Sequence, residues 1–443
     1  MDLTTLRDIL LWNGCKTIYV KRLAPNDNSK NQIYLGGSFD ILNIFPTSDI
    51  ICEPKGNWTK DRFKASVRFS WITETGKLVP APSTQLVLYP KYPEVRLSGF
   101  LKGCPVAPSD LMASRLEGRL LFMSVSANGE VISYAASGQS VLASEFNRIH
   151  NLKMHGVFQV IEIVAGQINR ERLLYEMLRI HNMGWIQSKR LDKFKEIKPC
   201  LSPNCGGYTL EAELGITPNG YSEPDFMGYE IKQFHASNFS RFGSEVITLM
   251  TPEPTSGFYV ESGVEAFIRK YGYKDKLGRP DRMNFGGIHK VGNTNPLTSL
   301  KLDLAGFDVT TNKITSVDGR ISLIDKHGDE AASWSFASLL SHWNRKHNLA
   351  CYVPSQSIKT PVLHYRYGNN LIIGNGTNFI FFLNQMHTGN VYYDPGIKLE
   401  NASTEPTTKR RSQFRIKSGN IRNLYYTTEM VDLLHPNQGS ILI

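Results

Sequence analysis

The sequence predicts an α+β fold of two domains. We expect an all-β N-terminal domain at residues 1–148, a helical connector at 149–183 and an α/β C-terminal domain with a central mixed sheet at 184–443. The chain has 443 residues, enough for about two or three domains. Apolar residues recur in short alternating runs up to about residue 140 and at helical spacing after residue 151. Hydrophobic residues form 41% of the chain, which is ample for packed cores.

Short β-branched or alternating runs between turn residues are typical of β structure, and they recur through the N-terminal region. The expected strands lie at residues 17–23, 32–35, 63–72, 85–89, 120–125 and 131–134. The run Ser-Ala-Asn-Gly-Glu at 126–130 favours a hairpin turn between the last two. This region is therefore predicted to be all-β.

Residues 151–183 carry apolar side chains at helical spacing, with arginine and glutamate on the other faces. The pattern is clearest at Leu173, Leu174, Met177, Leu178 and His181. A histidine in such a position is more often a packed or surface residue than a ligand. We therefore expect a helix that connects the two domains.

The chain is basic, with 50 Lys and Arg against 40 Asp and Glu, a formal net charge of +10. A basic surplus favours polyanionic partners, although ribosomal, membrane-surface and heparin-binding proteins share it. No run approaches the roughly eighteen apolar residues of a membrane span. The N-terminus also lacks the basic and apolar regions of a secretory signal, so we expect a soluble, cytoplasmic protein with no membrane partner.

The six cysteines are scattered at positions 15, 52, 104, 200, 205 and 351, without a Cys-x-x-Cys pair. In a reducing cytoplasm this pattern predicts free thiols, most of them buried. Cys200 and Cys205 lie five residues apart in a loop. Because no second pair of cysteines or histidines accompanies them, a structural zinc site is not expected.

The run at residues 224–232 contains Asp225, Glu230 and Lys232, the residue types that metal-dependent phosphodiester cleavage requires. If residues 229–234 form a strand, Glu230 and Lys232 lie on the same face. Asp225 and Glu230 would hold a hard cation such as Mg²⁺, and Lys232 would position or deprotonate the attacking water. A Pro-Asp turn followed by Glu-x-Lys also occurs by chance on solvated strand edges.

Glu211 strengthens the interpretation. Residues 208–216 are predicted to form a short helix with Leu210 and Leu214 inward, and a loop at 217–223 precedes the strand. The order is therefore an acid on a helix, a loop, a second acid, and a strand with Glu-x-Lys.

This order, with fourteen positions from Glu211 to Asp225 and five from Asp225 to Glu230, resembles the MvaI/BcnI family of restriction endonucleases, a branch of the PD-(D/E)xK nucleases. The resemblance covers roughly residues 175–430 and includes segments at 184–190, 246–252, 269–275, 334–339 and 413–416. It implies that Asp225 and Glu230 are metal ligands, Lys232 the catalytic lysine and Glu211 an accessory acid. It also implies a Mg²⁺ cofactor.

Residues 409–422 contain six basic residues among fourteen, which favours a DNA-contacting loop and strand. The candidate contacts in this domain are Asp394, Lys398, Lys409, Arg410, Arg411, Gln413, Arg415, Lys417 and Arg422. Arg415 matches the family's arginine in Phe-Arg-Ile, and Asp394 lies near a family acid. Gly396 stands where the family has an arginine, and residues 407–411 replace a His-rich stretch. The resemblance therefore indicates the target sequence less clearly than it indicates the cleavage chemistry.

Residues 19–29 and 32–35 resemble the opening of the EcoRII-type N-terminal effector domain, a pseudobarrel that binds DNA. Residues 94–97 and 102–103 fall where that family has a basic recognition arm, here shorter and less basic. An arginine reads guanine and an acid reads the cytosine amino group, which favours Arg96 and Glu94. The candidate contacts are Lys21, Arg22, Asn26, Asp27, Glu94, Arg96 and Lys102. Ordinary solvated strand charges are the alternative for each of them.

Together the resemblances imply a type IIE restriction endonuclease that cuts double-stranded DNA and is stimulated by a second DNA copy at the effector domain. The expected target is CC(A/T)GG, with CC(C/G)GG or CCGG next, cut by a monomer that nicks the strands in turn. A cytosine methyltransferase is expected in the same system. A modification-dependent type IV enzyme, a repair-type nickase and a non-catalytic DNA-binding regulator are the alternatives.

Overall fold

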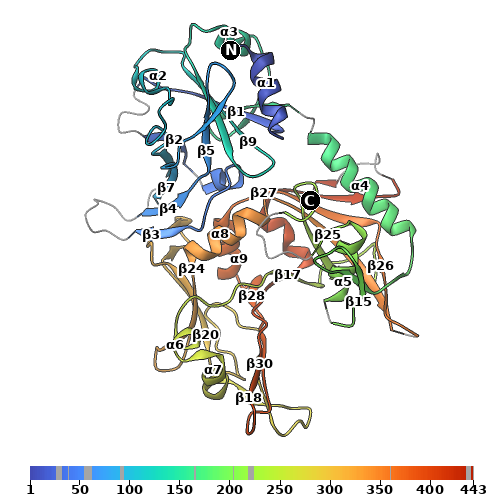
Figure 1. Ribbon diagram of the computed structural model, residues 1–443. Coiled ribbons are helices and arrows are strands. Elements are labelled where there is room, and N and C mark those ends of the chain that lie inside the picture. Colours follow the sequence, from blue (N-terminus) through green and yellow to red (C-terminus); the bar gives the residue numbers. More distant parts are fainter. Residues whose placement is uncertain are drawn as a thin grey trace. The chain divides into compact units, whose positions relative to one another are not determined.

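The computed structural model describes residues 1–25, 32–37, 39–53, 62–89, 94–163, 166–202, 204–217, 224–359, 361–435 and 441–442. The chain divides into two compact units, residues 1–170 and 171–443 (Figure 1). Both contain helices and strands, which confirms the α+β class. Among the described residues, no helix has the length and apolar character needed to span a membrane.

The N-terminal unit contains two sheets. The seven-stranded sheet has the order β11-β12-β1-β9-β10-β5-β6, and the five-stranded sheet the order β2-β8-β7-β4-β3. Their strands are β1 (Thr17–Arg22), β2 (Gln32–Gly36), β3 (Ile51–Glu53), β4 (Arg62–Ser66), β5 (Phe69–Ile72), β6 (Leu78–Pro80), β7 (Gln85–Tyr89), β8 (Glu94–Ser98), β9 (Leu120–Val125), β10 (Val131–Ala136), β11 (Lys153–His155) and β12 (Phe158–Glu162). A short 3-10 helix, η1, spans Phe39–Asn43.

The expected strands at 85–89 and 120–125 have the predicted bounds, and Gly129 in the expected turn adopts a positive φ of 78°. The run expected at 63–72 is interrupted at residues 67–68, because β4 and β5 belong to different sheets. Hydrophobic periodicity marks both strands but not the sheet that each one joins.

Three helices, α1 (Leu3–Trp12), α2 (Ser109–Ala113) and α3 (Val141–Asn147), lie in the region that was predicted to be all-β. The sequence carries a start signal for α1, since the Asp2 carboxylate accepts a hydrogen bond from the N–H of Thr5 at 2.7 Å. Leu6 of α1 and Phe146 of α3 share a core with Ile18 and Phe122 of the larger sheet. Helices α1 and α3 therefore cover one face of that sheet.

The helical connector expected from residue 149 begins later than predicted. Residues 153–155 and 158–162 form β11 and β12, and the helix α4 spans Gly166–Asn182. Thr17 to Val20 pair with residues 159–162, so the edge of the larger sheet holds this segment in an extended conformation.

The C-terminal unit is built on a mixed sheet, as predicted. Its order is β13-β26-β25-β27-β32-β33, and β16 adds to β25 in parallel while the other pairs are antiparallel. The members are β13 (Ile186–Gln187), β16 (Glu230–His235), β25 (Leu349–Ile358), β26 (His364–Tyr367), β27 (Asn370–Thr377), β32 (Tyr425–Asp432) and β33 (Ile441–Leu442).

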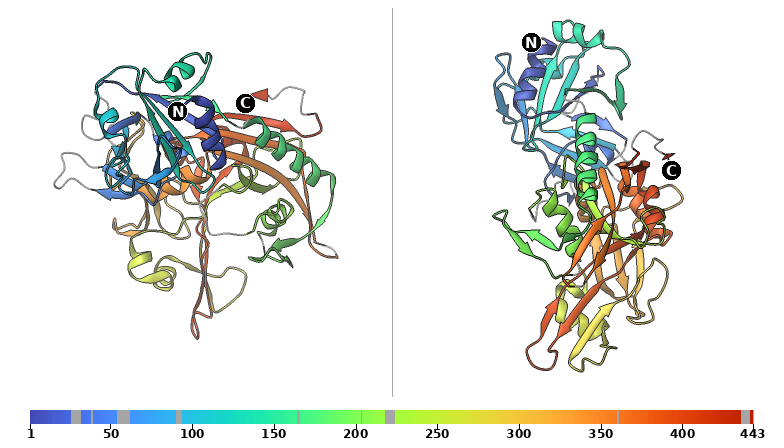
Figure 2. Two further views of the ribbon diagram at one scale, coloured as in Figure 1. Left: turned by 45° about the horizontal axis from the view of Figure 1, so that its top comes forward. Right: turned by 90° about the vertical axis from the view of Figure 1, so that its right-hand side faces the viewer.

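Helices α4 and α5 (Cys205–Glu213) pack against this sheet (Figure 2). Leu173 and Ile180 of α4 and Leu210 of α5 share a core with Ile231 of β16 and Val353 of β25. The other helices of the unit are α6 (Phe258–Glu261), α7 (Gly263–Tyr271), α8 (Phe336–Lys346), α9 (Phe379–His387) and the 3-10 helix η2 (Ser418–Leu424).

The remaining strands form small sheets with the orders β17-β31-β28, β18-β19-β29-β30, β20-β23-β24, β14-β15 and β21-β22. These strands are β14 (Lys189–Leu191), β15 (Ile197–Pro199), β17 (Val246–Met250), β18 (Tyr273–Lys274), β19 (Arg282–Gly286), β20 (Lys301–Ala305), β21 (Phe307–Asp308), β22 (Lys313–Ile314), β23 (Arg320–Ile324), β24 (Glu330–Ser335), β28 (Val391–Tyr393), β29 (Gly396–Glu400), β30 (Thr407–Lys409) and β31 (Phe414–Lys417).

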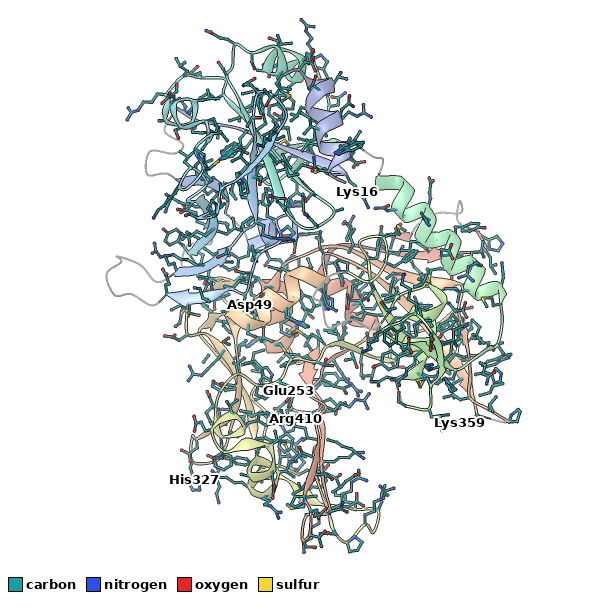
Figure 3. The ribbon with its side chains drawn as sticks, in the orientation of Figure 1. Lys16, Asp49, Glu253, His327, Lys359 and Arg410 are labelled. Carbon is teal, nitrogen blue, oxygen red and sulfur yellow. A yellow bond between two sulfur atoms is a disulfide. The ribbon has the colours of Figure 1, made fainter. Side chains whose placement is uncertain are left out.

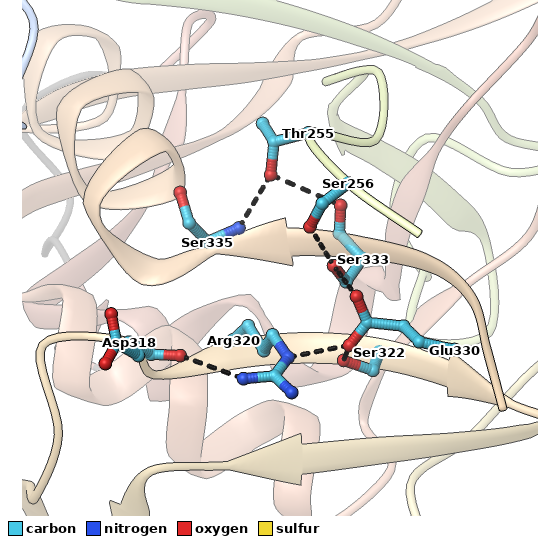
Figure 4. A network of polar contacts seen from close by, with 8 residues as sticks. All are labelled: Thr255, Ser256, Asp318, Arg320, Ser322, Glu330, Ser333 and Ser335. Atoms are coloured by element: carbon cyan, nitrogen blue, oxygen red, sulfur yellow. Dashed lines mark hydrogen bonds and ion pairs between the residues drawn. The ribbon is translucent and has the colours of Figure 1, made fainter. Parts of the chain in front are cut away.

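Figure 4 shows how polar side chains fasten β24 to its neighbours. The Glu330 carboxylate accepts hydrogen bonds from Arg320 Nε at 2.6 Å, Ser322 Oγ at 2.9 Å and Ser333 Oγ at 2.6 Å. Ser333 also contacts the hydroxyl of Ser256 at 2.7 Å. The network joins the segment before α6 to this sheet.

The expectation of free cysteines is wrong for one pair. Cys200 and Cys205 form a disulfide, while Cys15, Cys104 and Cys351 are buried free thiols and Cys52 is an exposed one. The turn between β15 and α5 brings the Cα atoms of the pair to 5.7 Å, a separation that suits a disulfide. The expectation of free thiols came from a reducing cytoplasm, which says nothing about how close Cys200 and Cys205 lie.

Candidate active site

A tight turn places Asp225 beside the strand that carries the other two motif residues. Phe226 and Tyr229 exchange backbone hydrogen bonds at 3.0 and 2.8 Å, and Met227 and Gly228 between them have positive φ values of 51° and 85°. Successive positive φ values allow the chain to reverse within two residues. The turn directs the Asp225 carboxylate to the N–H of Ile231, which donates to it at 2.9 Å.

Glu230 is almost completely buried at the start of β16. Its side chain is 2% exposed, and Lys232 Nζ lies 2.5 Å from its Oε1 atom, so the strand brings both residues to one face as predicted. Its second oxygen, Oε2, is buried and has no hydrogen-bond partner among the described residues. An orphaned carboxylate oxygen in the interior is costly unless a cation binds it.

Helix α5 brings Glu211 toward the same acids. The helix approaches β16 closely because Gly206 has no side chain: a Cβ atom there would lie 2.7 Å from Gln233 Oε1. The hydroxyl of Tyr367 donates to the carbonyl of Gly206 at 2.8 Å and holds the contact. The helix predicted at 208–216 therefore begins and ends about three residues earlier, at Cys205–Glu213.

The proximity of the acids changes their protonation. Burial and then the charge of Asp225 raise the pKa of Glu211 to about 7, while Lys232 opposes the rise. Burial also raises the pKa of Asp225 to about 6, with Glu230 contributing next. Burial alone would lower the pKa of Lys232, but Glu230, Asp225 and Glu211 raise it above its ordinary value. The cluster thus favours a bound cation.

The donor set fits a hard divalent ion. Among the described residues, no three His, Cys, Asp or Glu side chains form a complete metal cage. Mg²⁺ usually retains several waters and binds through one or two carboxylates together with substrate phosphates. Asp225 and the free Oε2 atom of Glu230 match that requirement.

Comparison with known proteins identifies the family of the chain. A family model described as the MvaI/BcnI restriction endonuclease family matches residues 174–425, more than half of the chain. The chain belongs to the MvaI/BcnI restriction endonuclease family. It is therefore a DNA-binding nuclease and a hydrolase.

Two solved structures are similar to the chain. One is a complex of the restriction endonuclease MvaI with cognate DNA substrate: it is 19% identical, covers 59% of this chain and 97% of that chain, and has a TM-score of 0.44. The other is MvaI in the absence of DNA, with 17% identity, the same two coverages and a TM-score of 0.31. A search of curated proteins found no match.

In this MvaI/BcnI-family chain, the predicted DNA contacts of the C-terminal unit lie on and around β29, β30, β31 and η2. Arg415 Nη1 lies 2.6 Å from Asp394 Oδ2, so the arginine that matches the family forms an ion pair with the acid that lies near a family position. The side chain of Arg411 passes over Gly396, and its Nη2 donates to Asn204 Oδ1 at 2.7 Å. The structure thereby links the basic segment to the residue that precedes α5.

The other members of this set differ in exposure and in their partners. Lys409 pairs with Glu400 at 2.8 Å, and Lys417 and Arg422 are exposed. Lys398 is half-buried on β29. Arg410 is exposed, and its charge lowers the pKa of Tyr259, which burial and then Glu253 raise; Figure 3 labels Arg410 and Glu253. Gln413 is only 4% exposed, so its amide is not presented at the surface.

The effector candidates lie on both N-terminal sheets. Glu94 and Arg96 form an ion pair on β8, and Lys102 is exposed beyond its end. Lys21 and Arg22 lie on β1 of the other sheet, where Lys21 is buried and Arg22 Nε donates to Gln159 at 2.9 Å. Asn26 and Asp27 lie outside the described residues.

Sequence reasoning also missed Lys346, which lies 3.8 Å from Glu230 through its Nζ atom. It ends α8, a long way along the chain from Lys232. No spacing rule relates the two lysines. The only sequence signal for Lys346 was its place as a basic residue at the end of an amphipathic helix.

Proposed function

We propose that this chain is a type II restriction endonuclease that hydrolyses phosphodiester bonds in double-stranded DNA at a short specific site. The observation that carries the proposal is the convergence of Glu211, Asp225, Glu230 and Lys232 around a buried carboxylate oxygen without a partner among the described residues. Membership of the family supports the same chemistry.

Asp225 and Glu230 would hold Mg²⁺, which when bound polarises the phosphate and lowers the pKa of a coordinated water. The raised pKa of Lys232 favours its ammonium form. Lys232 would therefore orient the attacking water and stabilise negative charge on the phosphate oxygens. Glu211, with a pKa of about 7, is suited to accept a proton from that water near neutral pH.

The proposed target is CC(A/T)GG, with CC(C/G)GG or CCGG next. Arg415, paired with Asp394, and Arg411 are the residues that we expect to approach base edges, because a guanidinium can donate two hydrogen bonds to guanine. The protein would act as a monomer with one active site. It would then cut the two strands in successive nicking events and accumulate a nicked intermediate.

The N-terminal unit would bind a second DNA copy and stimulate cleavage. Glu94 and Arg96, which pair on β8, and the exposed Lys102 are of the residue types that read a C·G pair and its backbone. A cognate cytosine methyltransferase would protect the host DNA.

Digestion of a sequenced plasmid with Mg²⁺, with and without short CC(A/T)GG duplexes, tests the proposal. Discrete fragments whose ends map to one sequence are expected, with nicked circles appearing before linear DNA and a faster rate when duplexes are added. Cutting confined to modified DNA would point to a type IV enzyme, and cutting confined to mismatched duplexes to a repair nickase. Either outcome would overturn the proposal, as would the absence of cleavage.

A further inference from the structure

Lys346 approaches the acid cluster from a different element than Lys232 does. Its Nζ atom lies 3.8 Å from Glu230 Oε1, the oxygen that Lys232 contacts at 2.5 Å. The charge of Lys346 also lowers the pKa values of Glu211 and Asp225 against the larger effect of burial. Lys346 therefore influences all three acids.

The position of Lys346 is fixed by the end of its helix. His347, which caps α8, stacks on Trp343 with ring centroids 4.1 Å apart and an interplanar angle of 15°. Trp343 Nε1 donates to Thr377 Oγ1 at 3.1 Å, and both rings are completely buried. The main chain at Lys346 is thus anchored in the core, while its side chain remains 21% exposed.

The two lysines differ in what they can do. Lys232 makes a direct hydrogen bond to a carboxylate on its own strand, whereas Lys346 lies at ion-pair distance without a hydrogen bond to Glu230. Both ammonium groups lie at Oε1, which leaves Oε2 open. The looser lysine is the one that can leave without breaking a hydrogen bond to the cluster.

The net charge of the cluster also favours the departure of Lys346 when a cation binds. In the ionised state three carboxylates face two ammonium groups, an excess of one negative charge. A divalent cation at Asp225 and Glu230 would reverse that excess and repel the less tightly held ammonium group. The DNA phosphates that arrive with the substrate supply new negative charge for a lysine that is partly exposed.

We propose that Lys346 is a positioning residue of this site: its ammonium group neutralises Glu230 before metal binds, and turns to a DNA phosphate once a divalent cation occupies the cluster. The proposal rests on the proposed function, because it assumes that the cluster binds a cation beside DNA. In the free protein Lys346 and the cation are competitors, whereas in the DNA complex they act together.

One variant, Lys346→Met, should change the affinity for metal and the affinity for DNA in opposite directions. In the absence of DNA the variant should bind Mn²⁺ about tenfold more tightly than the wild type, because a neighbouring positive charge is gone. With Ca²⁺ present it should bind a CC(A/T)GG duplex about tenfold more weakly, and the slope of log K against log salt should fall by about one unit.

The first measurement is a Mn²⁺ titration followed by the electron paramagnetic resonance of the free ion, a readout that needs no cleavage. The second is duplex binding by fluorescence anisotropy at several salt concentrations. Lys346→Arg keeps the charge and should restore both properties. Lys326→Met, which removes an exposed lysine from the turn between β23 and β24, is the matched control and should change neither.

A purely structural role for Lys346 would weaken both bindings together and lower the thermal midpoint, and that result would overturn the proposal. Unchanged Mn²⁺ affinity or an unchanged salt slope would also overturn it. If Lys346→Met is unstable, Lys346→Gln is measured in the same way. Failure of the proposed function would look different: the wild type itself would not bind Mn²⁺ or would not cut DNA.

Discussion

The acid cluster and the effector candidates differ in how the fold gathers them. Glu211, Asp225, Glu230 and Lys232 come from neighbouring elements, and one short turn and one glycine contact bring them together. Lys21 and Arg22 instead lie on a different sheet from Glu94 and Arg96. The residues proposed for catalysis come from a compact motif, whereas the residues proposed to contact effector DNA come from segments that the sequence does not relate.

The largest expected effect concerns the compact motif. Lys232→Met should lower the rate of plasmid nicking by about a thousandfold, because the charge beside Glu230 and the orientation of the water are both lost. Gel quantification of supercoiled, nicked and linear DNA measures the rate. Lys326→Met serves as the exposed control, and near wild-type nicking by the Lys232 variant would remove the basis for a shared catalytic centre.

A smaller effect is expected where the C-terminal unit contacts DNA. Arg415→Ala should weaken binding to the cognate duplex by about 1–3 kcal/mol and reduce discrimination against altered sites. Lys417→Ala, two residues further along β31, should weaken binding to all sequences alike and lower the salt slope by about one unit. Competition binding with cognate and scrambled duplexes distinguishes the two kinds of contact. Equal losses of affinity for both duplexes with Arg415→Ala would contradict a base contact by Arg415.

The effector group should affect stimulation more than chemistry. Arg96→Ala should lower the ratio of stimulated to unstimulated cleavage by about tenfold, as expected for the loss of one bidentate base contact. The ratio is measured over a titration with short effector duplexes. Lys77→Ala changes an exposed lysine elsewhere in the N-terminal unit and is the control. A ratio unaffected by Arg96→Ala would contradict an effector surface at β8.

The raised pKa values of Glu211, about 7, and Asp225, about 6, predict opposite trends for activity and stability. Cleavage should rise with pH below these values, by up to about tenfold per pH unit for each carboxylate that must ionise, and level off above pH 7. Between the ordinary values, 4.5 and 3.8, and the raised ones, the folded state binds more protons than the unfolded state. The free energy of unfolding of the metal-free protein should therefore fall as pH rises across this window.

The variant Glu211→Gln tests whether the charged form of Glu211 lowers the free energy of unfolding. At pH 8 the substitution should raise the free energy of unfolding of the metal-free protein, by an amount on the order of 1–2 kcal/mol, because a buried charge is removed. The gain should shrink toward pH 4, where the acid is already protonated. Urea unfolding at both pH values measures it, and a loss of stability at pH 8 would contradict the predicted destabilisation.

The smallest effect on cleavage is expected from the disulfide before α5. Replacing Cys200 and Cys205 together with serine should lower stability by about 2 kcal/mol, since the bond closes a short loop. Cleavage should change by less than about tenfold, because α5 is also held by Gly206 and Tyr367. Abolished cleavage by a folded variant would show that the bond itself fixes Glu211.

Much of the site could be predicted because it depends on local rules. The period of two placed Glu230 and Lys232 on one face, and the spacing from Glu211 matched a known family. The disulfide and the ion pairs of Lys346 could not be predicted, since each depends on where a separate segment arrives in space. The helices of the N-terminal unit were not predicted because they are short and lie among many segments with strand periodicity.

The sequence by itself determined the mixed α+β composition and the family, and it predicted the four residues of the proposed catalytic motif. These follow from side-chain periodicity and short-range spacing, which act within a few turns of the chain. The tertiary structure alone decided that Glu230 is buried with an open oxygen, that two lysines share its other oxygen, and that the basic segment lies beside Asn204. Burial and electrostatic coupling arise only when distant segments pack together, and they set the pKa values on which the chemistry depends.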